Sequence, residues 1–384
     1  MNILHLTHTD INADSRIIKE IKSLSKEQHY NIYGVGVNYE KGTVKEDLKK
    51  INIKIKSLEI FTKNLKILPR QIRHPLVFLE LFIKVMFFVN KKNLKIVHCH
   101  DTLVLPIGYF IKRIKKCKLF YDAHELESNK NGQSKLMSWG TLFIEKKCWK
   151  SIDLLISVSK SILDWYEKHL GLKKSILILN SPEIKKSDLL LNKISPNKGN
   201  YFHKEFNIQN STLIFLYLGF LTKGRGIEKI IDAFDSDQIN SHVVFVGYGN
   251  MKDYILKASK NNGKIHYHEA VKHDEVVKIS RDADIGLCLI EKISLSDYYC
   301  LPNKLFEYAF SGLPVLASDF PELKKMVHEF KLGLCCKIET RVIEEAIQKI
   351  EKAPLPKVDS DLRELSWESQ GNKLLNAYRS IKSF

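Results

Sequence analysis

Short apolar runs alternate along the chain with longer segments in which apolar residues recur at every third or fourth position. The first run, NILHLTH, has the length of a β-strand, and residues 15–27 follow it with their isoleucines and leucine on one helical face. Asp14 and Ser15 suit the start of that helix. Strands that alternate with helices predict a parallel sheet covered on both faces.

This alternation occurs twice, and a polar interval rich in Lys, Asn and Ser separates the two halves at about residues 184–200. The pattern predicts an α/β protein with two Rossmann-like doubly wound domains facing a cleft. We expect an N-terminal domain over residues 1–183 and a second domain over residues 200–365. Residues 366–384 are expected to form a helix that packs back toward the first domain.

The length and composition agree with this organisation. A chain of 384 residues has room for two domains, and 44% hydrophobic with 27% charged residues is ordinary for a globular protein. The opening MNILHLTH has no basic leader, which predicts a protein without a secretory signal. Seven cysteines without C-x-x-C spacing predict neither a disulfide framework nor a zinc site, so a reducing cytoplasm is expected.

The formal net charge of +17 requires an anionic partner or a lysine-rich background. We expect no nucleic-acid partner, because the sequence contains no RNP pattern or zinc finger. The most apolar run is residues 74–90, and basic residues flank it within residues 63–95. It is shorter than the roughly 20 residues of a spanning helix. Two interpretations stay open: an amphipathic helix on an anionic membrane, or a core helix whose Glu80–Lys84 pair faces water.

Glycines and cations gather at the end of one predicted strand in the second half, in LGFLTKGRGIEK. Glycine lets the backbone approach a ligand closely, and the cations Lys223 and Arg225 suit phosphate oxygens. A predicted helix follows, and its N-terminus also favours an anion. The segment predicts a phosphate-binding loop, with a simple polar turn as the alternative. Gly247 and Gly249 in VGYG are a weaker signal that a tight turn explains equally well.

A second candidate is LPNKLFEYAFSGLPV in the same half. Pro302 suits a helix start, and Asn303, Lys304 and Glu307 then point to a common side. Free amides at a helix start can bind a diphosphate, and a carboxylate one turn later can hold a ribose diol. The alternative is a capped amphipathic helix with one solvated polar face.

Histidines and acids end two predicted strands of the first half, in HCHD and YDAHE. No ligand set of metal-site spacing emerges, so we predict no metal, with one of His98 and His100 facing the cleft and the other buried. His124 and Glu125 are the better candidates for touching substrate.

These motifs resemble glycosyltransferase family 4, the retaining nucleotide-sugar transferases with the GT-B fold, over nearly the whole chain. In the first half the resemblance rests on the DSR-led helix, IVHCHD, YDAHEL and LILNSPE. In the second half it rests on YLGFLTKGRGIE, VFVGYG and, most specifically, LPNKLFEYAFSGLPV. The resemblance implies transfer of a sugar from a nucleoside diphosphate such as UDP to an acceptor hydroxyl, without a metal or another cofactor.

The resemblance also implies roles for residues. Glu307 would hold the donor ribose, Arg225 would bind the diphosphate, and His124 would lie near the reacting sugar. The predicted catalytic residues are His124, Arg225 and Lys223. The predicted donor-binding residues are Gly219, Gly224, Gly247, Glu269, Val271, Tyr299, Leu301, Pro302, Asn303, Lys304 and Glu307. The residues predicted on the acceptor side are Arg16 and Glu125.

The sequence departs from the family pattern at three places. Tyr299 stands where the family has the first glutamate of a pair, and Asp297 is a weak substitute. Phe220 stands where an arginine is usual, which leaves Lys223 as the stand-in. THTDINADSR replaces the glycine-rich first loop, and Arg16 is expected to supply contacts there. Two alternatives therefore stay open: a nucleotide-sugar-binding protein of the same fold without transfer activity, or a sugar-nucleotide epimerase.

The resemblance further implies a hexosyl- or N-acetylhexosaminyl-transferase of bacterial surface polysaccharide synthesis, such as lipopolysaccharide or capsule. Its acceptor would be a glycan or a lipid-linked precursor. Together with the basic, apolar segment at residues 63–95, this predicts a location at the inner face of the cytoplasmic membrane, in peripheral contact with anionic lipid.

Overall fold

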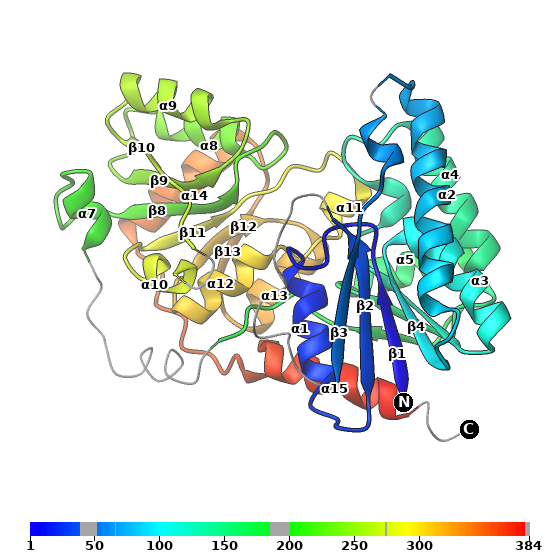
Figure 1. The fold of residues 1–384 in the computed structure, drawn as a ribbon. Helices are drawn as coiled ribbons and strands as arrows, with labels where there is room; N and C mark the ends of the chain where they lie inside the picture. Colours follow the sequence, from blue (N-terminus) through cyan, green and yellow to red (C-terminus); the bar gives the residue numbers. More distant parts are fainter. Residues whose placement is uncertain (39–51, 66, 185–199, 273–274, 381–384) are drawn as a thin grey trace. The chain divides into compact units, whose positions relative to one another are not determined.

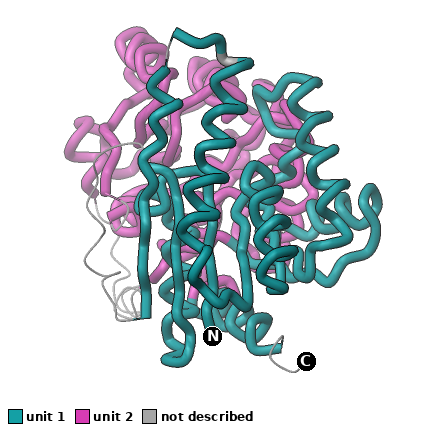
Figure 2. Tube along the Cα trace, turned by 45° about the vertical axis from the view of Figure 1, so that its right-hand side comes forward, with its two compact units in different colours: residues 1–179, 368–384 teal, residues 180–367 magenta. Residues whose placement is uncertain are grey.

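The computed structural model describes residues 1–38, 52–65, 67–184, 200–272 and 275–380. The chain divides into two compact units (Figure 2). The first consists of Met1–Leu179 with Glu368–Phe384, and the second of Asn180–Trp367. Most of the polar interval predicted between the domains lies outside the described residues. None of the helices within the described ranges is both long and apolar enough to span a lipid bilayer.

The first unit contains a seven-stranded sheet in the order β3-β2-β1-β4-β5-β6-β7, and its neighbouring strands pair in parallel (Figure 1). Its strands are β1 (Asn2–Leu6), β2 (Asn31–Val37), β3 (Ile53–Leu58), β4 (Leu94–His100), β5 (Lys118–Ala123), β6 (Leu154–Ser157) and β7 (Ser175–Leu177). The strand order reverses between β1 and β4. In doubly wound sheets a ligand site lies outside the carboxyl ends of the strands at such a reversal.

Helices cover both faces of this sheet. They are α1 (Ser15–Leu24), α2 (Arg70–Val89), α3 (Leu105–Lys115), α4 (Lys135–Trp149), α5 (Lys160–Leu170) and α15 (Trp367–Arg379), with 3-10 turns η2 (Thr62–Asn64), η3 (Thr102–Val104) and η4 (Glu127–Asn129). Successive strand residues point to opposite faces. A Cβ at Gly34 would meet Ile21 of α1, whereas the adjacent Tyr33 packs against Phe88 of α2. The helices α1 and α2 therefore lie on opposite faces.

Helix α2 has two apolar sides. Leu81, Val85 and Val89 are buried, whereas Ile72, Leu79, Ile83 and Phe87 are exposed. The exposed residues are spaced by seven, four and four positions, so they form one stripe along the helix. The exposed stripe contradicts the interpretation of a core helix. The Glu80–Lys84 pair is partly exposed, at 2.6 Å, and Glu80 also accepts hydrogen bonds from the backbone amides of Phe61 and Thr62 at 2.9 and 2.8 Å.

The second unit contains a six-stranded parallel sheet in the order β10-β9-β8-β11-β12-β13. Its strands are β8 (Ile214–Phe220), β9 (His242–Tyr248), β10 (Ile265–His268), β11 (Ile285–Cys288), β12 (Val315–Ser318) and β13 (Gly333–Cys336). Its helical segments are α7 (Tyr201–Glu205), α8 (Ile227–Phe234), α9 (Lys252–Asn261), α10 (Val276–Ser280), α11 (Leu295–Tyr298), α12 (Asn303–Ser311), α13 (Pro321–Glu329), α14 (Thr340–Lys352) and η5 (Arg363–Leu365). The strand order reverses between β8 and β11.

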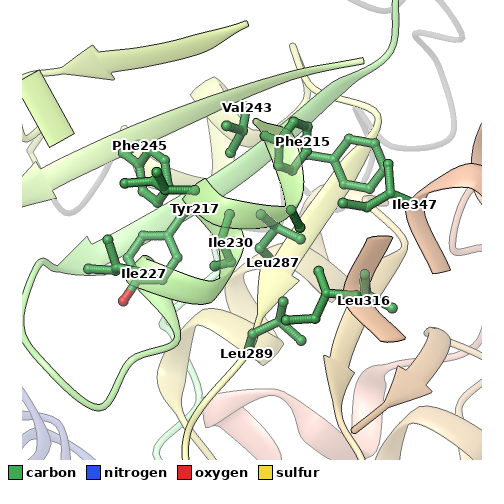
Figure 3. Close-up of a cluster of buried hydrophobic side chains, with 14 of the residues drawn as sticks. Phe215, Tyr217, Ile227, Ile230, Val243, Phe245, Leu287, Leu289, Leu316 and Ile347 are labelled. Carbon is green, nitrogen blue, oxygen red and sulfur yellow. The ribbon is translucent and has the colours of Figure 1, made fainter. Parts of the chain in front are cut away.

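One core of this unit lies between the sheet and the helices α8 and α14, where Phe215, Ile230 and Ile347 meet (Figure 3). The other face of the sheet is covered by α12. Gly286 leaves room there for the ring of Tyr308, because a Cβ at this position would lie 2.5 Å from the ring. The predicted fold class, two doubly wound α/β domains, is confirmed. That the two domains face a cleft stays a prediction.

Candidate functional site

In the second unit, several predicted donor-binding residues come together at the strand-order reversal. The loop after β8 carries Arg225, which is half-buried, and α12 begins close to the end of the neighbouring β11. Pro302 is the N-cap residue of α12, and no side chain caps the first amides of this helix. Uncapped amides at a helix start attract anions. This end of the sheet therefore combines a guanidinium group with a helix N-terminus.

Lys304 lies in the first turn of α12 and reaches back over the end of β8. Its ammonium nitrogen is 3.4 Å from the ring centroid of Tyr217, and a Cβ on Gly219 would lie 3.9 Å from its Cε. Burial lowers the pKa of Lys304 to about 7, and the charge of Arg225 lowers it too, whereas Glu307 acts in the opposite direction. Arg225, Lys304 and Glu307 therefore share one electrostatic environment, as a diphosphate clamp requires.

Asp297 also belongs to this cluster. Its carboxylate lies 3.8 Å from Nη1 of Arg225 and accepts a hydrogen bond from the Ser294 hydroxyl at 2.8 Å. Tyr299 follows α11 as its C-cap residue, and its ring centroid lies 5.4 Å from that of Tyr298. The carboxylate next to the clamp is thus that of Asp297, the residue that the sequence offers as a substitute for the missing glutamate.

Other predicted residues lie apart from these contacts. Lys223 is exposed in the loop. Glu269 and Val271 follow the edge strand β10, where Glu269 is exposed and pairs with Lys252 at 2.5 Å. Leu301 is buried, and Asn303 is exposed at the start of α12. Of the predicted donor-binding residues, Glu269 and Val271 therefore lie after the edge strand, whereas Lys304 and Glu307 lie at the strand-order reversal.

Two of the predicted glycines have structural reasons of their own. A Cβ on Gly247 would lie 1.9 Å from the carbonyl oxygen of Gly219, so the close packing of β8 on β9 requires glycine there. Gly224 has a φ of +82° and accepts a hydrogen bond from the amide of Glu291 at 3.0 Å, which ties the Arg225 loop to the end of β11. These glycines shape the backbone on which the cations stand.

The second unit also has a pocket of about 380 Å³. Some of its lining residues are close in sequence to the cluster, but Arg225, Lys304 and Glu307 do not line it. Its lining residues are Lys229, Glu291, Lys292, Ile293, Tyr298, Asp319, Phe320, Lys337, Ile338 and Glu339. Lys229 and Glu291 already form an ion pair at 2.8 Å within it. The candidate site is therefore the Arg225–Lys304–Glu307 cluster, where the cationic side chains lie next to uncapped helix amides.

In the first unit, the predicted residues lie at the carboxyl ends of β4 and β5, beside the reversal between β1 and β4. His124 is 18% exposed, and its Nε2 lies 3.2 Å from Oδ2 of Asp122. Glu125 is exposed, as a residue that touches substrate must be. Asp101 approaches Nδ1 of His124 at 3.7 Å. His124 therefore stands between two carboxylates at the expected ligand-binding edge.

Arg16 is buried, which contradicts its prediction as a residue on the acceptor side. Its guanidinium is 3% exposed and binds Asp122 through two hydrogen bonds, both of 3.0 Å. It also donates to the backbone oxygen of Ile178 at 2.9 Å and pairs with Glu20 at 3.2 Å. Arg16 is thus a buried partner of Asp122.

The prediction for His98 and His100 is also wrong, because both are fully buried. Residues two apart on a strand point to the same face. The two rings stack with centroids 4.3 Å apart, and His98 binds the hydroxyl of Tyr378 in α15 at 2.6 Å. Burial lowers the pKa of both histidines, which favours their neutral forms.

Four buried side chains, His5, Glu20, His98 and His100, offer possible metal-ligand atoms within 4.8 Å of one another. Stacked rings, however, place their nitrogens side by side, whereas metal ligands converge on one point. Nδ1 of His5 lies 3.0 Å from Nε2 of His100, which is a hydrogen-bond distance. In a second group, His100, Asp122 and His124, Arg16 already binds both oxygens of Asp122. This geometry favours hydrogen bonding over coordination, and the absence of a metal stays a prediction.

Sequence reasoning did not assign roles to Asp101, Asp122 or Tyr217. Asp101 and Asp122 stand in the HCHD and YDAHE segments, so a strand-end position was the available signal. Tyr217 carries no such signal, because its contact with Lys304 depends on how α12 packs on β8.

The second unit matches a family of known proteins. Residues 200–365, nearly all of the second unit, match the family described as glycosyl transferases group 1. The chain is 25% identical over 259 residues to an uncharacterized glycosyltransferase, MJ1607, of Methanocaldococcus jannaschii. That alignment covers 61% of this chain and 60% of the relative. The resemblance to glycosyltransferases that the motifs carry is therefore confirmed.

Solved structures share the fold over the whole chain. Sucrose-phosphate synthase from Thermosynechococcus elongatus superposes with a TM-score of 0.77 at 15% identity, covering 100% of this chain and 99% of that one. Anabaena Alr3699/HepE in complex with UDP-glucose gives a TM-score of 0.70 at 13% identity, covering 99% and 100%. At these identities the likeness establishes the GT-B fold.

Proposed function

We propose that this chain, whose residues 200–365 match the glycosyl transferases group 1, transfers a sugar from a nucleoside-diphosphate sugar to a hydroxyl of a glycan or lipid-linked acceptor. The observation that carries the proposal is the cluster of Arg225, Lys304 and Glu307 at the uncapped start of α12. Two cations and free helix amides suit a diphosphate, and a carboxylate one turn along the helix suits a ribose diol.

The proposed chemistry uses this cluster to stabilise the departing diphosphate. Negative charge develops on the leaving group as the glycosidic bond breaks, and preorganised cations lower the barrier by binding that charge. The sugar is transferred with retention of configuration, and a phosphate oxygen of the donor takes the proton of the acceptor hydroxyl. The side chains of Arg225 and Lys304 supply the positive charge, so no metal is assigned to the reaction.

The donor is proposed to be a UDP-sugar, because a structural neighbour, Anabaena Alr3699/HepE, was solved with UDP-glucose. The transferred group is proposed to be a hexosyl or N-acetylhexosaminyl group. His124 is proposed to contact the reacting sugar from the first unit, and Asp297 to replace the family's first glutamate beside Arg225.

A lipid-linked acceptor of bacterial surface polysaccharide synthesis fits the surface of α2. Its stripe of exposed residues ends in Phe87, which is 78% exposed, and the exposed Lys91 follows the C-cap residue Asn90. Phe82 of α2 packs on Phe110 of α3. Arg113, three residues after Phe110 on α3, is exposed. An apolar stripe bordered by cations suits the surface of an anionic bilayer. We propose peripheral contact there, at the inner face of the cytoplasmic membrane.

Donor binding and turnover test the proposal directly. UDP-, GDP- and ADP-sugars would be added to the purified chain, and thermal unfolding and sugar release would be measured for each. We expect one nucleotide to raise the melting temperature and to support slow donor hydrolysis. Arg225→Ala should then lower turnover by about 10²–10³-fold, because it removes one preorganised positive charge from the site that binds the leaving diphosphate. Glu307→Gln should weaken donor binding.

Arg341→Ala is the matched control, because Arg341 lies on α14 and is 89% exposed. Its kinetics should equal those of the unmodified chain. Binding without any hydrolysis or transfer would support a nucleotide-sugar-binding protein instead. Unchanged kinetics in both Arg225→Ala and Glu307→Gln would mean that the site is elsewhere.

A further inference from the structure

His124 lies between two carboxylates that approach its two ring nitrogens. Oδ2 of Asp122 is 3.2 Å from Nε2, and Oδ1 of Asp101 is 3.7 Å from Nδ1. At 3.2 Å a proton on Nε2 makes a hydrogen bond to Asp122, whereas a lone pair there would repel the oxygen. At 3.7 Å Asp101 lies beyond hydrogen-bond distance of Nδ1, but its negative charge favours a proton on that nitrogen. The two carboxylates together favour a doubly protonated ring.

Both carboxylates are themselves held in place. Arg16 donates two hydrogen bonds to Asp122, one to each oxygen, and this pair is buried. Asp101 has a φ of +69°, a conformation that is uncommon for residues other than glycine. Its amide donates to the backbone oxygen of Asp122 at 3.1 Å, which joins the two aspartates. Strain of this kind persists where the surrounding structure imposes it, often at functional sites.

The hydrogen bonds behind His124 agree with a doubly protonated ring. Nδ1 of His100 lies 3.2 Å from Nε2 of His124, and Nε2 of His100 lies 3.0 Å from Nδ1 of His5. Nδ1 of His100 also lies 3.6 Å from Oδ2 of Asp122, beyond hydrogen-bond distance. A neutral His100 that accepts at Nδ1 from His124 and donates at Nε2 to His5 satisfies the two shorter contacts. His124 is then the proton donor at its end of the chain.

We propose that Asp101 and Asp122 are positioning residues that hold His124 as an imidazolium, a fixed cation at the ligand-binding edge of the first unit. A doubly protonated ring has no lone pair, so His124 cannot act as a general base. It instead supplies positive charge to an oxygen-rich ligand. The catalytic consequence rests on the proposed sugar transfer, whereas the charge state itself does not.

The surrounding charges support this balance. Burial alone would lower the pKa of His124, but Asp122 and Asp101 more than offset it and raise the pKa to about 10, with Arg16 opposing them. Other charged or titratable groups around the two aspartates and His124 come from several elements: His8 after β1, Asp14 and Glu20 of the α1 region, His100 of β4, Glu127 of η4 and Lys130 after it.

The direct test is nitrogen NMR of the full chain labelled with ¹⁵N-histidine, with His124 assigned from the signal lost in His124→Asn. We expect both ring nitrogens of His124 to keep the chemical shift of an imidazolium from about pH 6 to about pH 9. An unperturbed histidine loses its charge within this pH range. Asp101→Asn removes one carboxylate in a residue type that tolerates positive φ. It should lower the titration midpoint of His124 by at least about one pH unit.

Asp164→Asn is the matched control, since Asp164 is an exposed aspartate on α5 that pairs with Lys160. It should leave the midpoint of His124 unchanged. A midpoint near 6.5 in the unmodified chain, or no shift in Asp101→Asn, would overturn the proposal. Asp122→Asn is less useful, because it leaves the buried Arg16 without its partner and endangers folding.

An activity measurement gives a second readout. If the chain transfers sugar, kcat/KM of Asp101→Asn should fall at alkaline pH, whereas kcat/KM of the unmodified enzyme should not. The reason is that only the variant loses the imidazolium charge within the measured pH range. An identical pH profile in both proteins would contradict a catalytic use of the charge. A chain with no transfer activity would refute the proposed function, and the NMR titration would still decide the charge state.

Discussion

Lys304 combines a buried ammonium group with a position at the start of a helix. Burial lowers its pKa to about 7, so this side chain is a mixture of charged and neutral forms near neutral pH. A bound diphosphate favours the charged form and must raise this pKa. Donor binding and proton uptake are therefore linked at this residue.

This linkage predicts a pH dependence of donor affinity. Affinity should be greatest below about pH 7, where Lys304 is already protonated, and should fall above it by up to about tenfold per pH unit. Calorimetric titration of the donor in buffers with different heats of ionisation would measure the proton taken up. In Lys304→Arg the side chain stays charged, so the slope should vanish. Equal slopes in both proteins would contradict the assignment.

At the residue scale, the sequence located some site residues and misjudged others for one reason. Arg225 and Glu307 stand in local motifs, a glycine-containing loop and a helix start, whose geometry follows from nearby residues. Arg16 stands in a local motif as well, but its partner Asp122 is 106 residues away in the chain. A side chain whose environment is supplied by a distant strand cannot be classified as buried or exposed from its neighbours in sequence.

At the scale of single elements, α12 owes its position to a tyrosine. The hydroxyl of Tyr308 accepts a hydrogen bond from the amide of Leu218 at 2.8 Å and donates to the carbonyl of Leu216 at 2.9 Å, both in β8. The pairing of β8 with β11 ends at Leu216, and the Tyr308 hydroxyl bonds to the amide of Leu218, two residues beyond that end. The same helix carries Lys304 and Glu307, so Tyr308 fixes where the clamp stands.

Tyr308→Phe should therefore destabilise the second unit. It leaves the buried amide of Leu218 without this acceptor, which costs about 1–3 kcal/mol. Urea unfolding followed by a probe in this unit would show a transition at lower denaturant concentration. Tyr254→Phe, at a residue that is 42% exposed, should leave the transition unchanged. If the two variants unfold alike, the hydroxyl does not anchor the helix.

For helix α2, hydrophobic periodicity predicted the helix but not which of its sides is buried. The run from residue 74 to residue 90 indicated a helix, and a helix from Arg70 to Val89 is present. Because apolar residues lie nearly all round the helix, the sequence could not predict whether its outer side is buried in the core or exposed at the surface. The sheet has room for one side, so Leu81 and Val85 are buried while Ile83 and Phe87 are exposed.

At the scale of the whole molecule, the net charge of +17 and this exposed stripe predict attachment to anionic membranes. The chain should sediment with liposomes that contain anionic lipid, and salt should weaken the binding because it screens charge. Replacing Phe87 by Ser should weaken binding by about 10- to 100-fold, since burying one large apolar side chain contributes about 1.5–3 kcal/mol. Tyr254→Ser, an exposed aromatic of the second unit, is the control. Sedimentation that ignores lipid charge, or equal binding of both variants, would contradict membrane docking by α2.

The sequence alone determined the doubly wound class of both domains and the glycine and helix-start motifs of the second unit. It also determined the succession of strands and helices along the chain, apart from the strand β3 (Ile53–Leu58), which it did not reveal. These features depend on residues that are near one another in the chain, where periodicity and turn chemistry act. The tertiary structure alone decided that Arg16 is a buried partner of Asp122, that His98 and His100 stack inside the first unit, and that Lys304 lies over Tyr217. Strand order and register bring these partners together, and both arise only when the whole sheet forms.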